Sequence, residues 1–373
     1  MKGITTLIKP SSSLCNMRCS YCFYHDVTEN RVVREYGLMG PDVLEAIVSK
    51  ALDESESFCR FAFQGGEPTL SGLGFYEGLI GLVAKHNRKG LEVSYSIQTN
   101  GLAIDGDWAR FLSENKFLVG LSLDGHKDIH DSNRLDALGG ETFTRVMKAA
   151  DALTAAKAEF NILCVVTSQT ARHISKIYSF FKKAGFGYLQ FIQHINPFEY
   201  GMEYVHGLSA DRYRRFLITL FDEWYDDFMS GNYVSIRHID NVVRQFMGYP
   251  PEQCGMNGRC SCQFVFEADG GCYPCDFYVV DRWRLGNILE NGYAEMMGSG
   301  KAQEFVGRSR AGADSACPTC EWAGICGGGC MRYRDDGGES AVLSDYCGAY
   351  KDYFGHVRSK VGEVIRRLRG RSV

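Results

Sequence analysis

Six short runs of apolar and β-branched residues alternate with segments of helical periodicity, and this alternation limits the fold more than any other feature. The predicted strands cover residues 4–8, 58–63, 93–97, 118–123, 160–166 and 188–192. The predicted helices between them cover residues 41–52, 74–86, 104–114, 141–155 and 171–183. Strands and helices in this order indicate a parallel α/β sheet, either open or closed into a barrel.

Several of the predicted strands end in polar or glycine-rich turns. The turn 64–68 (QGGEP) follows the second strand, 98–101 (QTNG) follows the third, and Asp124-Gly125 follows the fourth. Parallel α/β folds bind their ligands at the carboxyl ends of the strands. We therefore expect these turns to share one rim of the sheet.

The chain changes character near Cys254. Residues 209–229 predict one long amphipathic helix whose aromatic face we interpret as core packing. From Cys254 onward glycine and cysteine are frequent, and the only element that the pattern predicts is a hairpin at 263–268 and 272–274. The last part of the chain is again predicted to be helical. An irregular segment with little apolar core is typically held together by metal. We predict an α/β domain at 1–235, a cysteine-rich domain at 236–348 and a helix at 349–373.

The overall composition is that of an ordinary globular protein, with 45% hydrophobic and 23% charged residues and a net charge of −4. This charge gives no reason to expect nucleic acid or a membrane as a partner. No signal peptide and no apolar run of about 20 residues is visible. We expect a cytoplasmic protein, whose thiols stay reduced.

The fifteen cysteines are therefore the informative part of the composition. An odd number in a chain of this kind argues against a disulfide scaffold and for metal or redox chemistry. Three lie between Cys15 and Cys22 and ten between Cys254 and Cys347. Cys59 and Cys164 stand apart in apolar strands, where we interpret them as small buried hydrophobes.

The spacing Cys15-x3-Cys19-x2-Cys22 supplies three thiolates directly after the first strand. Three ligands leave one iron of a [4Fe–4S] cluster open, whereas electron-transfer clusters use four cysteines. An open iron can chelate an amino and a carboxylate group. The alternatives are a zinc site completed by His25, for which this spacing is unusual, or fortuitous cysteines.

Residues 15–22 (CNMRCSYC) resemble the CxxxCxΦC motif of the radical S-adenosylmethionine (SAM) superfamily, and Gly65-Gly66-Glu67-Pro68 resembles its GGEP motif. The resemblance implies a partial (β/α)6 barrel of the TIM type and a cluster on Cys15, Cys19 and Cys22 that binds SAM. The residues that it implies for the SAM site are Tyr21, Gly65, Gly66, Glu67, Ser122, Asp124, Arg134 and Ile195. In this family Glu67 holds the methionine ammonium, Ser122 the ribose and Arg134 the carboxylate. Taken alone, Ser122, Asp124 and Arg134 are better interpreted as an ordinary strand-end serine, a turn aspartate and a surface arginine.

The C-terminal cysteines include Cys317-x2-Cys320-x5-Cys326-x3-Cys330, preceded by Gly270-x4-Cys275. This arrangement resembles the SPASM extension of radical SAM enzymes, which implies two fully ligated auxiliary [4Fe–4S] clusters and three clusters in all. The implied ligands are Cys254, Cys260, Cys275 and Cys330 for the first and Cys317, Cys320, Cys326 and Cys347 for the second. A zinc ribbon is the alternative, and Cys262 or Cys272 could replace Cys260 or Cys275.

Longer stretches resemble the anaerobic sulfatase-maturating enzymes over essentially the whole chain. They are IKPSSSLCNMRCSYCFYH, FAFQGGEPTL, NILCVVT, CGMNGRC and YPCDFYVVDRWRLGNI. The resemblance implies oxidation of a cysteine or serine, in a CxPxR or SxPxR segment of a sulfatase, to Cα-formylglycine, with a flavodoxin or ferredoxin as electron donor.

The same resemblance implies that Asp276 is the base. Taken alone, Asp276 is better interpreted as a turn aspartate or as a hydrogen-bond acceptor near the cluster. A neighbouring anionic cluster is expected to raise the pKa of its carboxyl. We expect Tyr24, Gln64, Gln98 and Asn100 to line the substrate channel, although each could instead satisfy backbone groups at strand ends.

Two other functions remain open. Another SPASM peptide-modifying enzyme would form a thioether or epimerise a residue in a ribosomal peptide. Such enzymes often carry a peptide-binding segment before the first strand, and few residues precede Cys15 here. A non-catalytic iron–sulfur electron carrier is disfavoured because a carrier needs no open iron.

Overall fold

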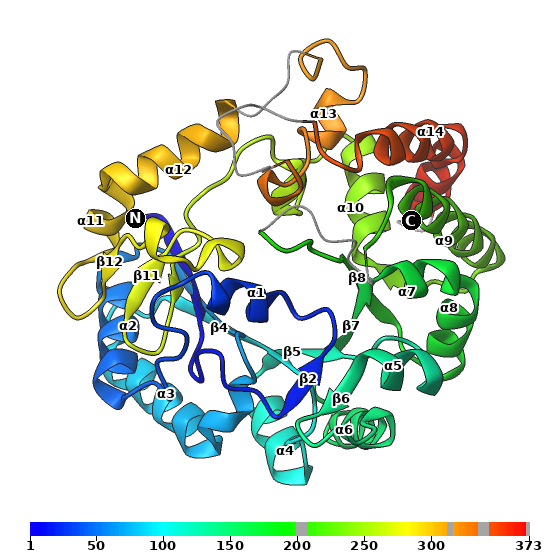
Figure 1. Ribbon diagram of the computed structural model, residues 1–373. Coiled ribbons are helices and arrows are strands. Elements are labelled where there is room, and N and C mark those ends of the chain that lie inside the picture. Colours follow the sequence, from blue (N-terminus) through cyan, green and yellow to red (C-terminus); the bar gives the residue numbers. More distant parts are fainter. Residues whose placement is uncertain (199–206, 312–315, 335–342, 371–373) are drawn as a thin grey trace. The chain divides into compact units, whose positions relative to one another are not determined.

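The computed structural model describes residues 1–198, 207–311, 316–334 and 343–370 (Figure 1). The backbone groups into two compact units, which are described separately. Unit 1 comprises Met1–Ser122, Asn133–Phe160 and Ser261–Val306, and unit 2 comprises Leu123–Ser132, Asn161–Cys260 and Gly307–Val373. The predicted domain limits at residues 235 and 348 stay a prediction.

Unit 1 contains a sheet that joins strands from both ends of the chain. Its order is β12 (Gly286–Asn287), β11 (Gly271–Tyr273), β10 (Val265–Phe266), β1 (Gly3–Ile8), β3 (Phe58–Phe63), β4 (Glu92–Thr99) and β5 (Phe117–Ser122). Strands β10, β1, β3, β4 and β5 are parallel, whereas β11 and β12 continue the sheet antiparallel. In register, Ile8 pairs with both Phe63 and Phe266. The loops that follow β1, β3, β4 and β10 therefore leave the sheet at the same edge.

The helices of unit 1 alternate with its strands along the chain. They are α1 (Phe23–Glu29), α2 (Pro41–Glu54), α3 (Leu73–His86), α4 (Gly106–Glu114), α6 (Phe143–Ala155) and α11 (Tyr293–Gly298), with α12 (Gly300–Ala311) next in the chain. Asp105 caps α4 because its carboxylate accepts hydrogen bonds from the N–H groups of Asp107 and Trp108, both at 3.0 Å. The core is aromatic at this point: the buried Tyr76 ring lies 5.1 Å from Phe63 and 5.4 Å from Trp108.

A two-stranded antiparallel ribbon lies outside the main sheet of unit 1. It consists of β2 (Met17–Cys19) and β6 (Arg134–Asp136), and Cys19 pairs with Arg134. A short 3-10 helix, η1 (Pro68–Ser71), follows the glycine turn after β3. Neither the ribbon nor the short helix α11 follows from the hydrophobic pattern, because short elements show too few periods.

Unit 2 contains the parallel strands β7 (Phe160–Val166), β8 (Tyr188–Gln193) and β9 (Ser235–Ile236). Its helices are α5 (Lys127–Asn133), α7 (Ser168–Arg172), α8 (Ile174–Lys183), α9 (Ala210–Ser230), α10 (Arg237–Phe246), α13 (Ala323–Cys326) and α14 (Cys347–Gly370). The predicted aromatic face of α9 is core, as interpreted: Phe221 and Trp224 are buried, and Phe221 packs edge-on against Tyr353 of α14.

The predicted strands and most of the predicted helices are present. The exception is the helix predicted at 171–183, which is two helices, α7 and α8, meeting at His173. The first begins earlier than predicted because Thr167 caps it, its hydroxyl accepting a hydrogen bond from the Thr170 N–H at 3.1 Å. None of the described helices is long and apolar enough to span a membrane.

Candidate active site

The three N-terminal cysteines lie on a tight loop of unit 1. Cys15 follows β1, Cys19 ends β2 and Cys22 caps α1. The Cys22 N–H donates to the Cys19 carbonyl at 3.2 Å, and the Met17 N–H donates to the Cys15 sulfur at 3.3 Å. Burial raises the pKa of the Cys22 thiol, and the backbone N–H groups that donate to its sulfur work against that rise. A buried thiol of this kind loses its proton on binding a cation.

The glycine turn after β3 touches this cysteine loop directly. The Gly66 N–H donates to the Ser12 carbonyl at 2.8 Å and the Glu67 N–H to the Leu14 carbonyl at 2.7 Å. A Cβ atom at Gly66 would lie 2.0 Å from the Leu14 oxygen, so no other residue fits. Gly65 has φ +123°, in the region that favours glycine. The two sequence motifs therefore form one structural feature.

Glu67 ties this feature to the end of β4. Its carboxylate is buried, with Oε1 accepting from the Thr69 N–H, the Thr69 hydroxyl and the Thr99 hydroxyl at 3.1, 2.6 and 2.7 Å. Oε2 accepts from the Asn100 N–H at 2.8 Å. Burial raises the pKa of Glu67, and these hydrogen bonds oppose the rise. The contact of Glu67 with the SAM ammonium stays a prediction. In the structure, the Glu67 carboxylate orients the glycine turn.

Arg134 places a positive charge beside the thiols. Its Nη1 lies 3.9 Å from the Cys19 sulfur, and its guanidinium carbon lies 5.4 Å from the centre of the Tyr21 ring. Asn100 reaches the cysteine loop: its amide donates to Asn16 Oδ1 at 2.7 Å and approaches the Cys15 sulfur at 3.8 Å. Its place in the substrate channel stays a prediction. Three thiols beside a guanidinium fit an anionic cluster with one open iron.

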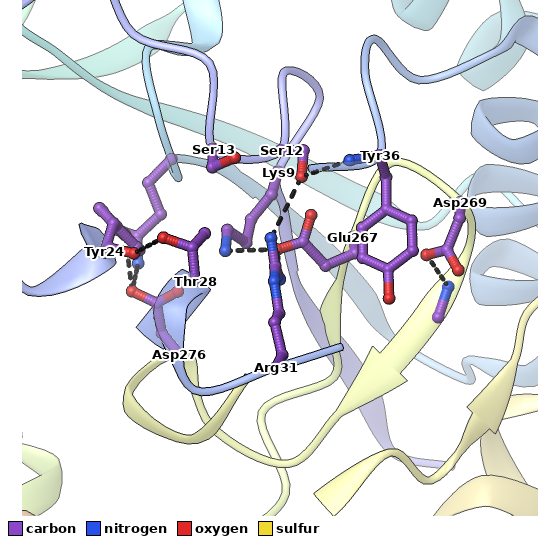
Figure 2. Close-up of polar contacts among 12 residues, drawn as sticks. Lys9, Ser12, Ser13, Tyr24, Thr28, Arg31, Tyr36, Glu267, Asp269 and Asp276 are labelled. Carbon is purple, nitrogen blue, oxygen red and sulfur yellow. Dashed lines mark hydrogen bonds and ion pairs between the residues drawn. The ribbon is translucent and has the colours of Figure 1, made fainter. Parts of the chain in front are cut away.

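Asp276 lies in a second group of polar side chains in unit 1 (Figure 2). It begins η3 (Asp276–Tyr278), directly after Cys275. The Tyr24 hydroxyl and the Gln64 amide both donate to its Oδ2 at 2.7 Å. Within the described part of the chain its buried Oδ1 has no partner. Burial raises the pKa of Asp276, and the ammonium group of Lys9 works against this rise.

Tyr24 acts as a donor in this group because burial raises the pKa of its phenol well above the usual value. Two of the four predicted substrate residues, Tyr24 and Gln64, thus meet the predicted base. Gln98 is exposed on β4.

The other predicted SAM contacts are divided between the two units. Ser122 is half-buried at the end of β5 in unit 1. Asp124 and Ile195 are buried in unit 2. The Asp124 carboxylate accepts a hydrogen bond from the Val165 N–H at 3.0 Å, as expected of a structural turn aspartate.

Four of the C-terminal cysteines line one pocket of unit 2. Cys317, Cys320, Cys326 and Cys347 share it with Trp322, Tyr350 and Phe354. Burial raises the pKa of Cys326 to about 11, and the other three thiols add to the rise. The four thiols line the walls of this pocket. This arrangement fits a cubane, whose thiolates bind separate irons.

The first auxiliary set is divided between the units. In unit 2, burial raises the pKa of Cys330 to about 12, and the neighbouring thiols Cys260 and Cys254 raise it further. The assignment of Cys330 to the same cluster as Cys254 and Cys260 stays a prediction. Cys275 belongs to unit 1. So does Cys272, which is fully buried in β11.

Cys59 and Cys164 are each 1% exposed, which confirms their interpretation as small core residues. They lie on β3 and β7.

Three charged residues in unit 1 were missed by the sequence reasoning. Lys9 and Arg31 both contact Glu267 Oε1 at 2.6 Å, and all three side chains are buried. Their positions in the sequence could have indicated two of them, because Lys9 and Glu267 each directly follow an apolar strand. A charge at such a place ends a strand at the rim where ligands bind.

Comparison with known proteins decides the family. The Radical SAM superfamily matches residues 10–181, and an iron-sulfur cluster-binding domain, SPASM, matches residues 254–321. The chain is 48% identical, over 99% of its length and 100% of the relative's, to a cysteine-type anaerobic sulfatase-maturating enzyme of Clostridium perfringens. The chain belongs to the anaerobic sulfatase-maturating enzymes.

Cysteine-type and serine-type anaerobic sulfatase-maturating enzymes are both similar to this chain. A serine-type anaerobic sulfatase-maturating enzyme of Klebsiella aerogenes is 30% identical over 98% of this chain and 87% of its own. A solved structure of native anSMEcpe with bound AdoMet and Cp18Cys peptide superposes with a TM-score of 0.94 at 48% identity, covering 98% of this chain and 99% of that one. The predicted fold class, an α/β radical SAM fold followed by a SPASM domain, is confirmed. The chain is a radical SAM enzyme, and its two domains imply SAM and iron–sulfur clusters as cofactors.

Proposed function

We propose that this enzyme oxidises a cysteine of a sulfatase polypeptide to Cα-formylglycine. The observation that carries the proposal is Asp276, a buried carboxylate whose Oδ2 is held by Tyr24 and Gln64 while Oδ1 stays unpartnered among the described residues. The similarity to cysteine-type relatives, at 48% identity against 30% for the serine-type one, supports cysteine as the substrate residue. A peptide is bound in the similar anSMEcpe structure.

Three [4Fe–4S] clusters are proposed as cofactors. Their ligands are Cys15, Cys19 and Cys22 for the first, Cys254, Cys260, Cys275 and Cys330 for the second, and Cys317, Cys320, Cys326 and Cys347 for the third. When bound, SAM and the N-terminal cluster supply the 5′-deoxyadenosyl radical that removes a hydrogen atom from the substrate Cβ, and the auxiliary clusters supply an acceptor for the departing electron.

The residues of the chain hold SAM and move one proton. The turn at Gly65 and Gly66, oriented by Glu67, binds the methionine ammonium, and Arg134 binds its carboxylate. Asp276 Oδ1 accepts the proton of the substrate thiol. Tyr24 and Gln64 fix Oδ2, so the carboxylate presents one oxygen in a defined direction. A positioned base contributes about 10²–10⁴ in rate.

The overall chemistry balances. The substrate loses one hydrogen atom from Cβ, one proton from sulfur and one electron, which gives a thioaldehyde. Water then replaces the sulfur and releases hydrogen sulfide. The partners are a sulfatase segment of the CxPxR type, with SxPxR as the serine counterpart, and a reduced flavodoxin or ferredoxin-type donor. The proposed location is the cytoplasm, with neither nucleic acid nor membrane as a partner.

The test is an anaerobic assay with SAM, reductant and a CxPxR peptide. The expected products are 5′-deoxyadenosine and a peptide aldehyde seen by mass spectrometry. Asp276→Asn should still cleave SAM but lose product by about 10²–10⁴-fold. Asp281→Asn is the matched control, since Asp281 likewise begins a short 3-10 helix, η4 (Asp281–Trp283), but is exposed. Deoxyadenosine without any peptide aldehyde would refute the proposal and favour another peptide modification.

A further inference from the structure

A buried ion triad lies beside the proposed base, and the reaction described above gives it no role. Lys9 Nζ and Arg31 Nη1 both contact Oε1 of Glu267 at 2.6 Å, and the three side chains are at most 1% exposed. The strands explain the pairing: Ile8 is in register with Phe266, so the next residues, Lys9 and Glu267, leave the sheet side by side. Buried charges are costly unless paired.

The two cations of the triad differ in what else they touch (Figure 2). Lys9 Nζ lies 5.0 Å from the centre of the Tyr24 ring, whose hydroxyl donates to Asp276 Oδ2. Arg31 faces the other way, over the ring of Tyr36 at 5.2 Å. Lys9 is therefore the cation of the triad that reaches the base, through one aromatic ring.

The aliphatic part of Lys9 also supports the glycine turn. A Cβ atom at Gly65 would lie 3.0–3.1 Å from Cβ, Cγ and Cε of Lys9. The Lys9 side chain therefore runs directly beside the turn proposed to hold SAM, and its ammonium group ends against Tyr24. One side chain contacts both the SAM turn and the support of the base.

We propose that Lys9 is a positioning residue, which holds Tyr24, and through it Asp276, in the orientation that couples SAM cleavage to substrate oxidation. Glu267 fixes the ammonium group, and the cation–π contact fixes the ring. The proposal rests on the proposed function, because it assigns Asp276 the role of base. Nothing in it requires Lys9 to touch the substrate.

The triad supplies its own matched control. Lys9→Met keeps the aliphatic stem beside Gly65 and leaves Arg31 and Glu267 as a balanced pair. Arg31→Met removes the other cation from the same carboxylate oxygen, at the same burial, without a contact to Tyr24. A purely structural role for the triad predicts similar behaviour of the two variants.

The experiment measures peptide aldehyde formed per 5′-deoxyadenosine in both holoenzyme variants. For Lys9→Met we expect the ratio to fall about tenfold, with kcat lowered and KM for the peptide unchanged. For Arg31→Met we expect a ratio within about twofold of the native enzyme, because no contact to Tyr24 is lost. Equal ratios in the two variants, whether lowered or native, would overturn the proposal.

Crystal structures of the two variants give a readout that needs no turnover. In Lys9→Met the Tyr24 hydroxyl should have left Asp276, and in Arg31→Met it should remain at 2.7 Å, as in the native chain. A Tyr24 hydroxyl still bonded to Asp276 in Lys9→Met would also overturn the proposal. A native enzyme that forms no aldehyde would refute the proposed function instead, and the two structures would still decide the role of Lys9.

Discussion

Replacing Gly66 by alanine tests the contact between the glycine turn and the cysteine loop. The added Cβ would lie 2.0 Å from the Leu14 carbonyl oxygen, a backbone atom that cannot swing aside as a side chain could. Non-bonded contacts of this kind stay above 3.0 Å, so Leu14 must move by at least 1.0 Å. Leu14 immediately precedes Cys15, and the displacement passes directly to a predicted cluster ligand.

The free-energy cost can be estimated from what the movement breaks. Overpacking of this size costs about 1–3 kcal/mol. The hydrogen bonds from Gly66 to Ser12 and from Glu67 to Leu14 are also lost, at roughly 1 kcal/mol each. The total of roughly 3–5 kcal/mol falls on the loop between β1 and β2, outside the strands, so we expect the loop to shift while the sheet stays folded. A misplacement of about 1 Å near reacting groups can lower a rate about 10²-fold.

The assay is the rate of 5′-deoxyadenosine formation from SAM, measured together with iron content. For Gly66→Ala we expect the rate to fall about 10²-fold, while the auxiliary clusters retain about eight irons per chain. Gly78→Ala is the control, because Gly78 lies within α3 with no heavy atom within 4 Å of its would-be Cβ. Alanine there favours the helix by about 1 kcal/mol. A Gly66→Ala enzyme that cleaves SAM within about threefold of the native rate would refute the steric reasoning.

Two further predictions concern unit 2. Burial lowers the pKa of His238 to about 4. Because its unfolded-state pKa is about 6.5, the unfolded chain binds a proton first as the pH falls, so stability should decline between about pH 6.5 and 4, by roughly 3 kcal/mol in all. Urea unfolding at pH 7 and pH 5 measures this, and an equal pH dependence in His238→Gln would contradict it. Cys326→Ala should leave about eight irons per chain and Cys164→Ala about twelve; iron analysis showing equal loss in both would contradict the assignment of the pocket.

The fold was largely predictable because its signals are local. The runs 58–63 and 160–166 coincide with β3 and β7, since each is long enough to show its own pattern. The predicted helix that ends at Lys183 is two helices, because hydrophobic periodicity does not register the break at His173. The short ribbon of β2 and β6 gave no signal, although it places Arg134 beside Cys19.

The sequence by itself determined the cysteine chemistry of this protein. Cys15, Cys19 and Cys22 lie within eight residues of one another, so their spacing already indicates how many thiolates a cluster can receive there. The same holds for Cys317, Cys320 and Cys326, and the structure places these three in one pocket with Cys347.

The tertiary structure decided everything around Asp276. Tyr24 is 252 residues away from Asp276 in the chain, and Lys9 is 258 residues away from Glu267. These contacts arise because β10 pairs in parallel with β1, which brings the two ends of unit 1 to the same edge of one sheet. Strand pairing between such distant segments depends on the packing of the whole core and leaves no local pattern. The proposed base was therefore predictable only by resemblance, and its proposed support by Lys9 only from the fold.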